Sequence, residues 1–249
     1  MRRRILVAAS AAAVTLALAG CSSDVSGVAE PAGQAGAALP GSSGSGTGGA
    51  SDEGAVTGRI EAPLGTLLLT PEAFPARYEA LVLPDNAVEQ ATADLDGIPA
   101  GASVDPAGCK PPPQAFGPDS TALIVGTDNA ARATISVELA RVDRTLDVRE
   151  SELAECPEVT TTLNGATATV TTTVLPAPPL NADDTMALRQ TVTSGNADQT
   201  VTQSMLRLVA QVDDVRISAT HMSFGDEAPD SAALDQLFTE AVQKVKAAQ

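Results

Sequence analysis

The segment Thr134-Ile135-Ser136-Val137-Glu138-Leu139 alternates polar with apolar side chains. Alternation with a period of two is the pattern of a β-strand that buries one face. The same pattern recurs near Val170 and Val174, where threonines take the polar positions. The sequence therefore predicts that strands begin at about Thr121 and form a sheet with one face against a core.

Turn signals separate the predicted strands by short connections. Asn164-Gly165, between two Thr-rich arms, is the sequence of a two-residue hairpin turn. Ser194-Gly195-Asn196 and Asp213-Asp214 mark two further breaks. The strand candidates beside these breaks are Met186–Thr193, Val201–Val212 and Val215–Phe224. Parallel strands need long crossovers, so these short connections predict an antiparallel meander.

The clearest single element is an amphipathic helix near the C-terminal end. Asp230 is placed to cap its first turn, and Lys244 and Lys246 complement the helix dipole at its end. We expect its apolar face to pack on the sheet; an exposed helix that binds a partner is the alternative. Six apolar residues share that face: Leu234, Leu237, Phe238, Ala241, Val242 and Val245.

The part of the domain before the strands has the pattern of helices and loops. Pro71 after Thr70 predicts a helix start, and Asp85–Leu95 predicts a second helix. The Gly- and Pro-rich segment from Gly97 to Pro118 predicts a loop around Cys109. The fold class we expect is α+β: a twisted antiparallel sheet, a meander, flanked by helices and closed by the C-terminal amphipathic helix.

The first twenty residues have the pattern of a secretory signal. Three arginines precede an apolar run, Ile5–Ala19, which is shorter than a comfortable membrane span. Leu18-Ala19-Gly20-Cys21 resembles the lipobox of bacterial lipoproteins. That resemblance implies cleavage before Cys21 and lipidation of Cys21 with diacylglycerol and acyl chains such as palmitate. A plain signal peptide cleaved near Ala19, with Cys21 incidental, is the alternative.

Composition divides the chain into three segments. Residues 1–20 are the predicted signal peptide, residues 21–58 the lipidated Cys21 with a Gly/Ser/Ala-rich tether, and residues 59–249 a single domain. The tether has too little apolar surface to offset its ordering entropy, so we expect it to be disordered. It would hold the domain at the outer face of the cytoplasmic membrane.

The charge of the chain excludes some partners. The formal net charge is −16 and aromatic residues make up 2% of the chain, so we expect no nucleic acid as a partner. An acidic domain is repelled by anionic headgroups, so acyl chains rather than surface charge would provide membrane attachment.

Two cysteines remain once Cys21 is assigned to lipid. Cys109 and Cys156 have one pairing available to them, and disulfides persist outside the cytoplasm, so we expect a bridge between them. A free catalytic thiol is the alternative.

No catalytic arrangement stands out around the one histidine. His221 would be the base of a Ser or Cys hydrolase, but no G-x-S-x-G motif supplies a nucleophile, so we expect a structural or solvent-facing side chain. Acidic groups occur at Asp183-Asp184, at Asp213-Asp214 and at Asp226-Glu227 with Asp230. Their spacing does not match an EF-hand loop, so we interpret them as solvated turn carboxylates and expect neither a metal site nor a cofactor.

Several motifs together resemble a known family. The lipobox, the tether, LLLTPEAFP (67–75), GCKPPP (108–113), the Thr/Val-rich strands and the closing helix look like mycobacterial-type cell-envelope lipoproteins of actinobacteria. The domain is similar in layout to the extracytoplasmic sensor domain of the kinase PknH. This resemblance implies a sheet flanked by helices, disulfide support and a cleft that binds a ligand.

The function we expect is therefore a lipid-anchored binding or sensor-like module of the cell envelope, without catalysis. It would recognise a small molecule or a protein partner. A carrier of apolar envelope lipids and an envelope hydrolase are the alternatives, and a purely structural role is another. Because the strands are rich in small side chains, the space between sheet and helices is either closely packed or a pocket.

Overall fold

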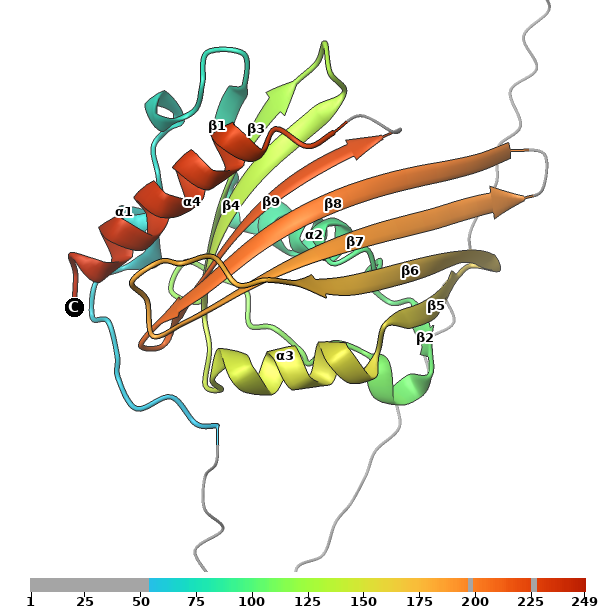
Figure 1. Ribbon diagram of the computed structural model, residues 1–249, viewed down its shortest axis with the longest axis horizontal. Helices are drawn as coiled ribbons and strands as arrows, with labels where there is room; N and C mark the ends of the chain where they lie inside the picture. The colour runs from blue at the N-terminus through green and yellow to red at the C-terminus, as the bar shows by residue number, and fades with distance from the viewer. Residues whose placement is uncertain (1–53, 197–198, 225–227) are drawn as a thin grey trace, which may run out of the picture. The chain divides into compact units, whose positions relative to one another are not determined.

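One antiparallel sheet organises the residues that the computed structural model describes, which are 54–196, 199–224 and 228–249 (Figure 1). Within these residues it has nine strands in the order β1-β3-β4-β9-β8-β7-β6-β5-β2. Four α-helices and two 3-10 turns accompany them. The strands are β1 Glu79–Val82, β2 Ser103–Asp105, β3 Thr121–Asp128, β4 Ala133–Arg141, β5 Glu158–Leu163, β6 Ala166–Leu175, β7 Asp184–Asn196, β8 Gln199–Val212 and β9 Val215–Phe224. The helices are α1 Leu64–Leu67, α2 Asp85–Leu95, α3 Leu146–Glu155 and α4 Ser231–Lys246, and the 3-10 turns are Pro71–Ala73 and Ala107–Cys109.

The predicted antiparallel meander is confirmed for β5 to β9. Each of these strands pairs with the next one along the chain. The hairpin of β3 and β4 joins the sheet beside β9, so the chain must cross the sheet from β4 to β5, and it does so through α3. The α+β class is thereby confirmed, with one long connection that the sequence did not predict.

The predicted turns hold the strands in register. Asn164 and Gly165 both have positive φ, at 51° and 82°, as a two-residue hairpin turn requires. Asp213 likewise has a φ of 50° in the turn between β8 and β9. The strand predicted to end at Thr193 continues to Asn196, because Ser194 and Gly195 still pair with β8.

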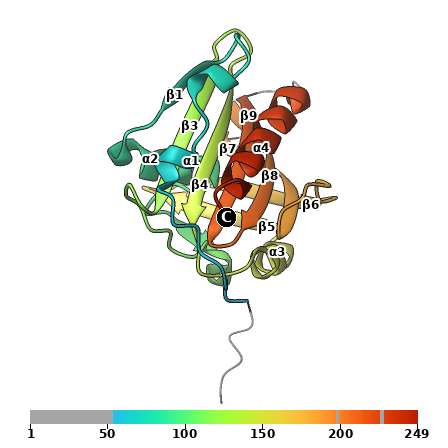
Figure 2. The same cartoon turned by 90° about the vertical axis from the view of Figure 1, so that its left-hand side faces the viewer.

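The main core lies between α4 and one face of the sheet. Figure 2 shows α4 lying along β4, β9 and β8. All six residues of the predicted apolar face are buried, and the Asp230 side chain accepts a hydrogen bond from the Ala233 N–H. The predicted packing of this helix is therefore confirmed. Ile135, Val137 and Leu139 of β4 face it, as their alternation predicts.

The opposite face of the sheet is covered less completely. There α2 packs against β3 through Val88, Leu95 and Leu123. Helix α3 contributes one fully buried residue, Leu146, to a small cluster with β7 and β8. The predicted disulfide between Cys109 and Cys156 is present and ties the 3-10 turn Ala107–Cys109 to the end of α3.

The sequence did not predict the two edge strands, nor the contacts made by residues near Ala55. β1 and β2 pair with β3 and β5 at the two edges of the sheet. Both are short, and β2 lies in the segment that its Gly and Pro content suggested was a loop. Ala55 forms an isolated antiparallel β-bridge with Arg144. Residues that the sequence assigned to the tether therefore already contact the domain.

The described residues belong to one compact unit, Gly49–Gln249. The predicted signal peptide, Cys21 and most of the tether lie outside the described residues. No helix in the described part of the chain combines the length and apolar character needed to cross a membrane.

Candidate functional site

A cleft of about 310 Å³ lies on the face of the sheet opposite α4. Its floor is formed by β4, β9, β8 and β7, and its walls by α3 and the segment Pro111–Ala115. The cleft exists because α3 has few apolar side chains toward the sheet. Leu146 and Leu153 pack against the small cluster, while Arg149 and Glu152 occupy the intervening turn and line the space.

The floor of the cleft follows from strand alternation. Since Val137 and Leu139 face the core under α4, Glu138 between them points to the opposite side. Glu138 is the cross-strand partner of Ser218, which in turn pairs with Val209. The centre of the floor is therefore a carboxyl, a hydroxyl and an apolar side chain in adjacent strands.

Glu138 also holds the segment Pro111–Ala115 against the sheet. Gln114 Nε2 donates to Glu138 Oε1 at 2.6 Å and to Thr121 Oγ1 at 3.1 Å, and Thr121 Oγ1 donates to the Ala115 carbonyl at 2.8 Å. Burial of the carboxyl raises the pKa of Glu138, and the charge of Asp96 acts in the same direction. The hydrogen bond from Gln114 and the charge of Arg207 oppose this rise in pKa.

Arg207 closes one end of the cleft and has partners for its whole guanidinium. It donates to Asp96 Oδ1 at 2.9 Å, to Thr220 Oγ1 at 3.2 Å and to the Leu95 carbonyl. Leu95 is the last residue of α2, so Arg207 satisfies a carbonyl at the helix C-terminus. We therefore assign Arg207 to positioning α2.

Arg216 lies at the other end of the cleft and is incompletely partnered. Its Nη2 donates to the Arg144 carbonyl at 3.0 Å and to Gln211 Oε1 at 3.2 Å. Its Nε is buried and has no hydrogen-bond partner. Among the described residues, no carboxylate lies within ion-pair distance of Arg216. Burial, followed by the charge of Arg149, lowers the pKa of Arg216.

A second incompletely partnered group lies near β7. Gln190 is 6% exposed, and its Nε2 donates to Thr172 Oγ1 at 3.3 Å, while its Oε1 has no partner. Gln190 and Arg216 both line the cleft. Buried polar atoms without partners are uncommon, and they concentrate where a protein binds something.

His221 takes no part in the cleft. It is 4% exposed and pairs in register with Ile135 and Leu206, whose side chains belong to the α4 side of the sheet. Burial and the positive charge of Arg77 lower its pKa. Of the two environments predicted for His221, structural or solvent-facing, this position agrees with the structural one.

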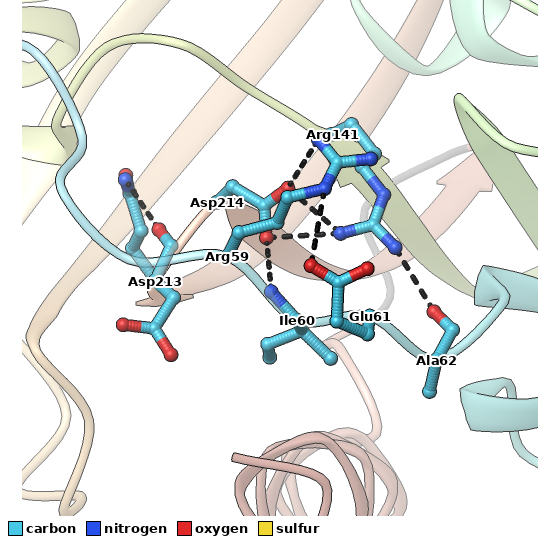
Figure 3. Close-up of polar contacts among 8 residues, drawn as sticks. Arg59, Ile60, Glu61, Ala62, Arg141, Asp213 and Asp214 are labelled. Atoms are coloured by element: carbon cyan, nitrogen blue, oxygen red, sulfur yellow. Dashed lines mark hydrogen bonds and ion pairs between the residues drawn. The ribbon is translucent and has the colours of Figure 1, made fainter.

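The prediction of solvated turn carboxylates is wrong for Asp214. Asp214 is 5% exposed, and Figure 3 shows it beside Arg141 and Arg59. Its Oδ1 accepts from the Ile60 N–H at 2.8 Å. The prediction failed because adjacent acids in a tight turn point to different sides, so that one is solvated while the other meets the core.

The other acidic groups fall into three cases. Asp183 and Asp184 accept hydrogen bonds from backbone N–H groups of Asp213 and Thr185. Asp230 forms an ion pair with Arg77 and accepts from the Tyr78 hydroxyl at 3.1 Å. Asp226 and Glu227 lie outside the described residues. No set of three metal-ligating side chains converges within the part of the chain that the structure describes.

The residues that line the cleft were not singled out from the sequence as a site. One signal was available: Arg207 and Arg216 interrupt strands whose neighbouring residues are mostly apolar. A charged residue in such a strand predicts a polar environment on one face. The sequence does not reveal that both face the side that α3 covers poorly.

Comparison with known proteins gave matches among solved structures alone. No family model and no curated protein matches the chain. The Rv0999 ortholog of Mycobacterium smegmatis is 15% identical, with a TM-score of 0.42, over 70% of this chain and 92% of that one. The extracellular domain of PknH from Mycobacterium tuberculosis is 12% identical, with a TM-score of 0.46, over 76% of this chain and 98% of that one. The extracellular domain of PknH is the domain whose layout the sequence resembles.

Proposed function

We propose that this chain is a lipid-anchored, extracytoplasmic binding or sensor-like module that recognises its ligand in the cleft beneath α3 and performs no catalysis. The observation that carries the proposal is a cleft whose lining includes the buried, unpartnered atoms Arg216 Nε and Gln190 Oε1. A well-formed cleft with a few polar groups is the usual form of a small-molecule site. A protein partner that inserts one polar side chain is the other occupant of the same site.

The chemistry of the cleft supports binding over catalysis. Ser218 is its central hydroxyl, but the histidine that could activate it, His221, belongs to the opposite face of the sheet. Glu138 is engaged by Gln114, which is itself held to Thr121. A nucleophile without a base within reach is weakly reactive.

The disulfide supports a location outside the cytoplasm, where such bonds persist. Cleavage before Cys21 and its lipidation would then place the domain on the outer face of the membrane. One mass spectrometric experiment tests both parts. The full chain is isolated from its own envelope in mild detergent, and denatured and native masses are compared.

We expect a denatured mass that begins at an acylated Cys21, and a further non-covalent mass in the native spectrum. Ser218→Phe fills the centre of the cleft and is expected to remove the non-covalent mass. Thr173→Phe, at an exposed position of β6 outside the cleft, is the matched control and is expected to keep it. An equal non-covalent mass increment in the parent and Ser218→Phe chains, each measured against its own denatured mass, would exclude the cleft as the binding site.

An apolar groove favours a lipid carrier as the second candidate. This groove, of about 650 Å³, lies at the other end of β5 to β9 and is lined by Leu163, Val192, Met222 and Phe224 among others. Phe224 is 44% exposed there. If the non-covalent mass is that of a lipid and survives Ser218→Phe, the groove rather than the cleft is the binding site.

A further inference from the structure

We propose that the Arg216 end of the cleft binds the oxyanion, a carboxylate or a phosphate, of the small molecule that occupies it. The inference rests on the proposed function, because it assigns a ligand chemistry to the same cleft. Three arginines meet at this end: Arg216 from β9, Arg149 from α3 and Arg144 from the segment before α3.

The charge at this end of the cleft is unbalanced. Glu152 is shared, because its Oε1 accepts from Arg144 at 3.1 Å and its Oε2 accepts from Arg149 at 3.2 Å. Arg216 has no carboxylate partner among the described residues, and its two hydrogen bonds go to uncharged oxygens. Asp143 also lines this end of the cleft, and its charge acts on Arg216 without forming an ion pair with it. Three guanidinium groups therefore share this end with two carboxylates, Glu152 and Asp143, which leaves one positive charge in excess. An anion is the chemical group that would complete this set.

This excess of positive charge contrasts with the rest of the molecule. The chain has 31 acidic and 15 basic residues. Five of its arginines line the cleft, and two of these are fully engaged, Arg141 by Asp214 and Arg207 by Asp96. The other three are Arg144, Arg149 and Arg216. Local enrichment against an opposite net charge indicates a site for a specific anion rather than attraction to an anionic surface.

Arg216 still has donors to offer. Both of its hydrogen bonds use Nη2, which leaves Nη1 without a partner in the described part of the molecule. Its Nε is occluded and unpartnered. Burying a guanidinium without a carboxylate is unfavourable, and a bound oxyanion compensates it. The floor carboxyl of Glu138 is engaged by Gln114 rather than by Arg216, and burial raises its pKa.

The test uses the full chain in mild detergent with inorganic phosphate and succinate as separate probes. Binding is measured by isothermal titration calorimetry at constant ionic strength, with sodium chloride as the screening control. We expect saturable binding of at least one probe, and the probe that binds distinguishes a phosphate ligand from a carboxylate one. Arg216→Gln should weaken that binding at least about tenfold, as the loss of a charged hydrogen bond implies. Arg189→Gln, at an exposed position of β7 outside the cleft, is the matched control and should not weaken it.

A second readout separates a binding arginine from a structural one. Without a probe, Arg216→Gln should unfold at the same temperature as the parent or at a higher one, because it removes a partly buried charge that lacks a carboxylate partner. If Arg216→Gln fails to fold, Arg149→Gln on α3 replaces it, with the same expected loss of binding. Anion binding that is unchanged in these variants, or no saturable binding of either probe, would overturn the proposal.

The outcome also separates this inference from the proposed function. A non-covalent mass that Ser218→Phe removes, in a chain that binds neither anion, leaves the binding module intact and excludes the oxyanion site. If the native mass shows no ligand whose binding depends on the cleft, the proposed function and the oxyanion site both lose their support.

Discussion

Arg141 donates from Nη1 to both carboxylate oxygens of Asp214, at 2.9 and 2.7 Å, and so joins the end of β4 to the turn between β8 and β9. Its Nη2 donates to the Ala62 carbonyl at 2.9 Å, and Asp214 accepts from the Ile60 N–H. Figure 3 shows the N-terminal segment 59–62 held by this pair. The ion pair therefore holds the segment 59–62 against the end of β4 and the turn between β8 and β9.

Asp214→Asn should destabilise the domain strongly. The side chains of Arg141 and Asp214 are 16% and 8% exposed, so the substitution leaves a largely buried guanidinium without its counter-charge. Breaking such a pair costs about 3 kcal/mol or more. Urea denaturation at pH 7 measures the change in free energy of unfolding.

The neighbouring acid provides the control for this prediction. Asp213 lies in the same turn with a positive φ, which Asn tolerates, and its Oδ2 accepts from Gln249 at the surface. Asp213→Asn is therefore expected to change the free energy of unfolding by less than about 0.5 kcal/mol. Equal effects of the two substitutions would contradict the role assigned to the Asp214 pair.

Reduction of the Cys109–Cys156 disulfide should lower stability without abolishing the main core. The cysteines are 47 residues apart, and chain entropy gives a bridge of that length about 4 kcal/mol. The bridge ties α3 to the turn Ala107–Cys109, whereas α4 and its core lie elsewhere. Cys109→Ser with Cys156→Ser should lower the urea midpoint, and hydrogen exchange should rise first in α3 and β5. A loss of protection that begins in α4 would show that the bridge stabilises a different region.

Strong periodicity made the larger part of the fold predictable. The strands from β5 to β9 and helix α4 carry their pattern locally, as alternation or as an apolar stripe, and they form where expected. β1 and β2 have no such pattern, since they are short and lie at the edges, and their pairing with β3 and β5 is what makes them strands.

The candidate site was less predictable because it depends on packing between distant segments. Alternation placed Glu138 on the face away from α4, but the cleft arises because α3 crosses this face while offering few apolar side chains. The unpaired state of Arg216 likewise depends on which carboxylates reach it in space. Neither property is present in a local pattern of residues.

Stability should fall as the pH is lowered below the ordinary His221 pKa of 6.5. Burial and the charge of Arg77 lower the pKa of His221 in the folded state, so the unfolded chain binds the proton first. The contribution is present above pH 6.5 and is lost as the pH falls toward the folded-state pKa. His221→Gln removes this contribution, so the difference in free energy of unfolding between the two chains should change between pH 7 and pH 5. A difference that is constant over this range would place the histidine in a solvated environment.

Glu138 should contribute a pH dependence of the opposite sign. Its pKa is raised above the ordinary value of 4.5, so the folded state keeps the proton to a higher pH than the unfolded chain does. Its contribution is present below pH 4.5 and is lost as the pH rises through the folded-state pKa. The groups that face it are Asp96, Arg207, Gln114 and Thr92.

Glu138→Gln isolates this contribution, because the amide oxygen can still accept from Gln114 while the group no longer ionises. We expect the variant to gain stability relative to the parent as the pH rises from 4.5 to 8, with the smallest difference at the acidic end. Urea denaturation across this range measures it, and Glu79→Gln on the exposed surface of β1 is the control. If Glu138→Gln instead loses stability as the pH rises, the carboxylate is stabilised as an anion, and Arg207 rather than burial determines its protonation.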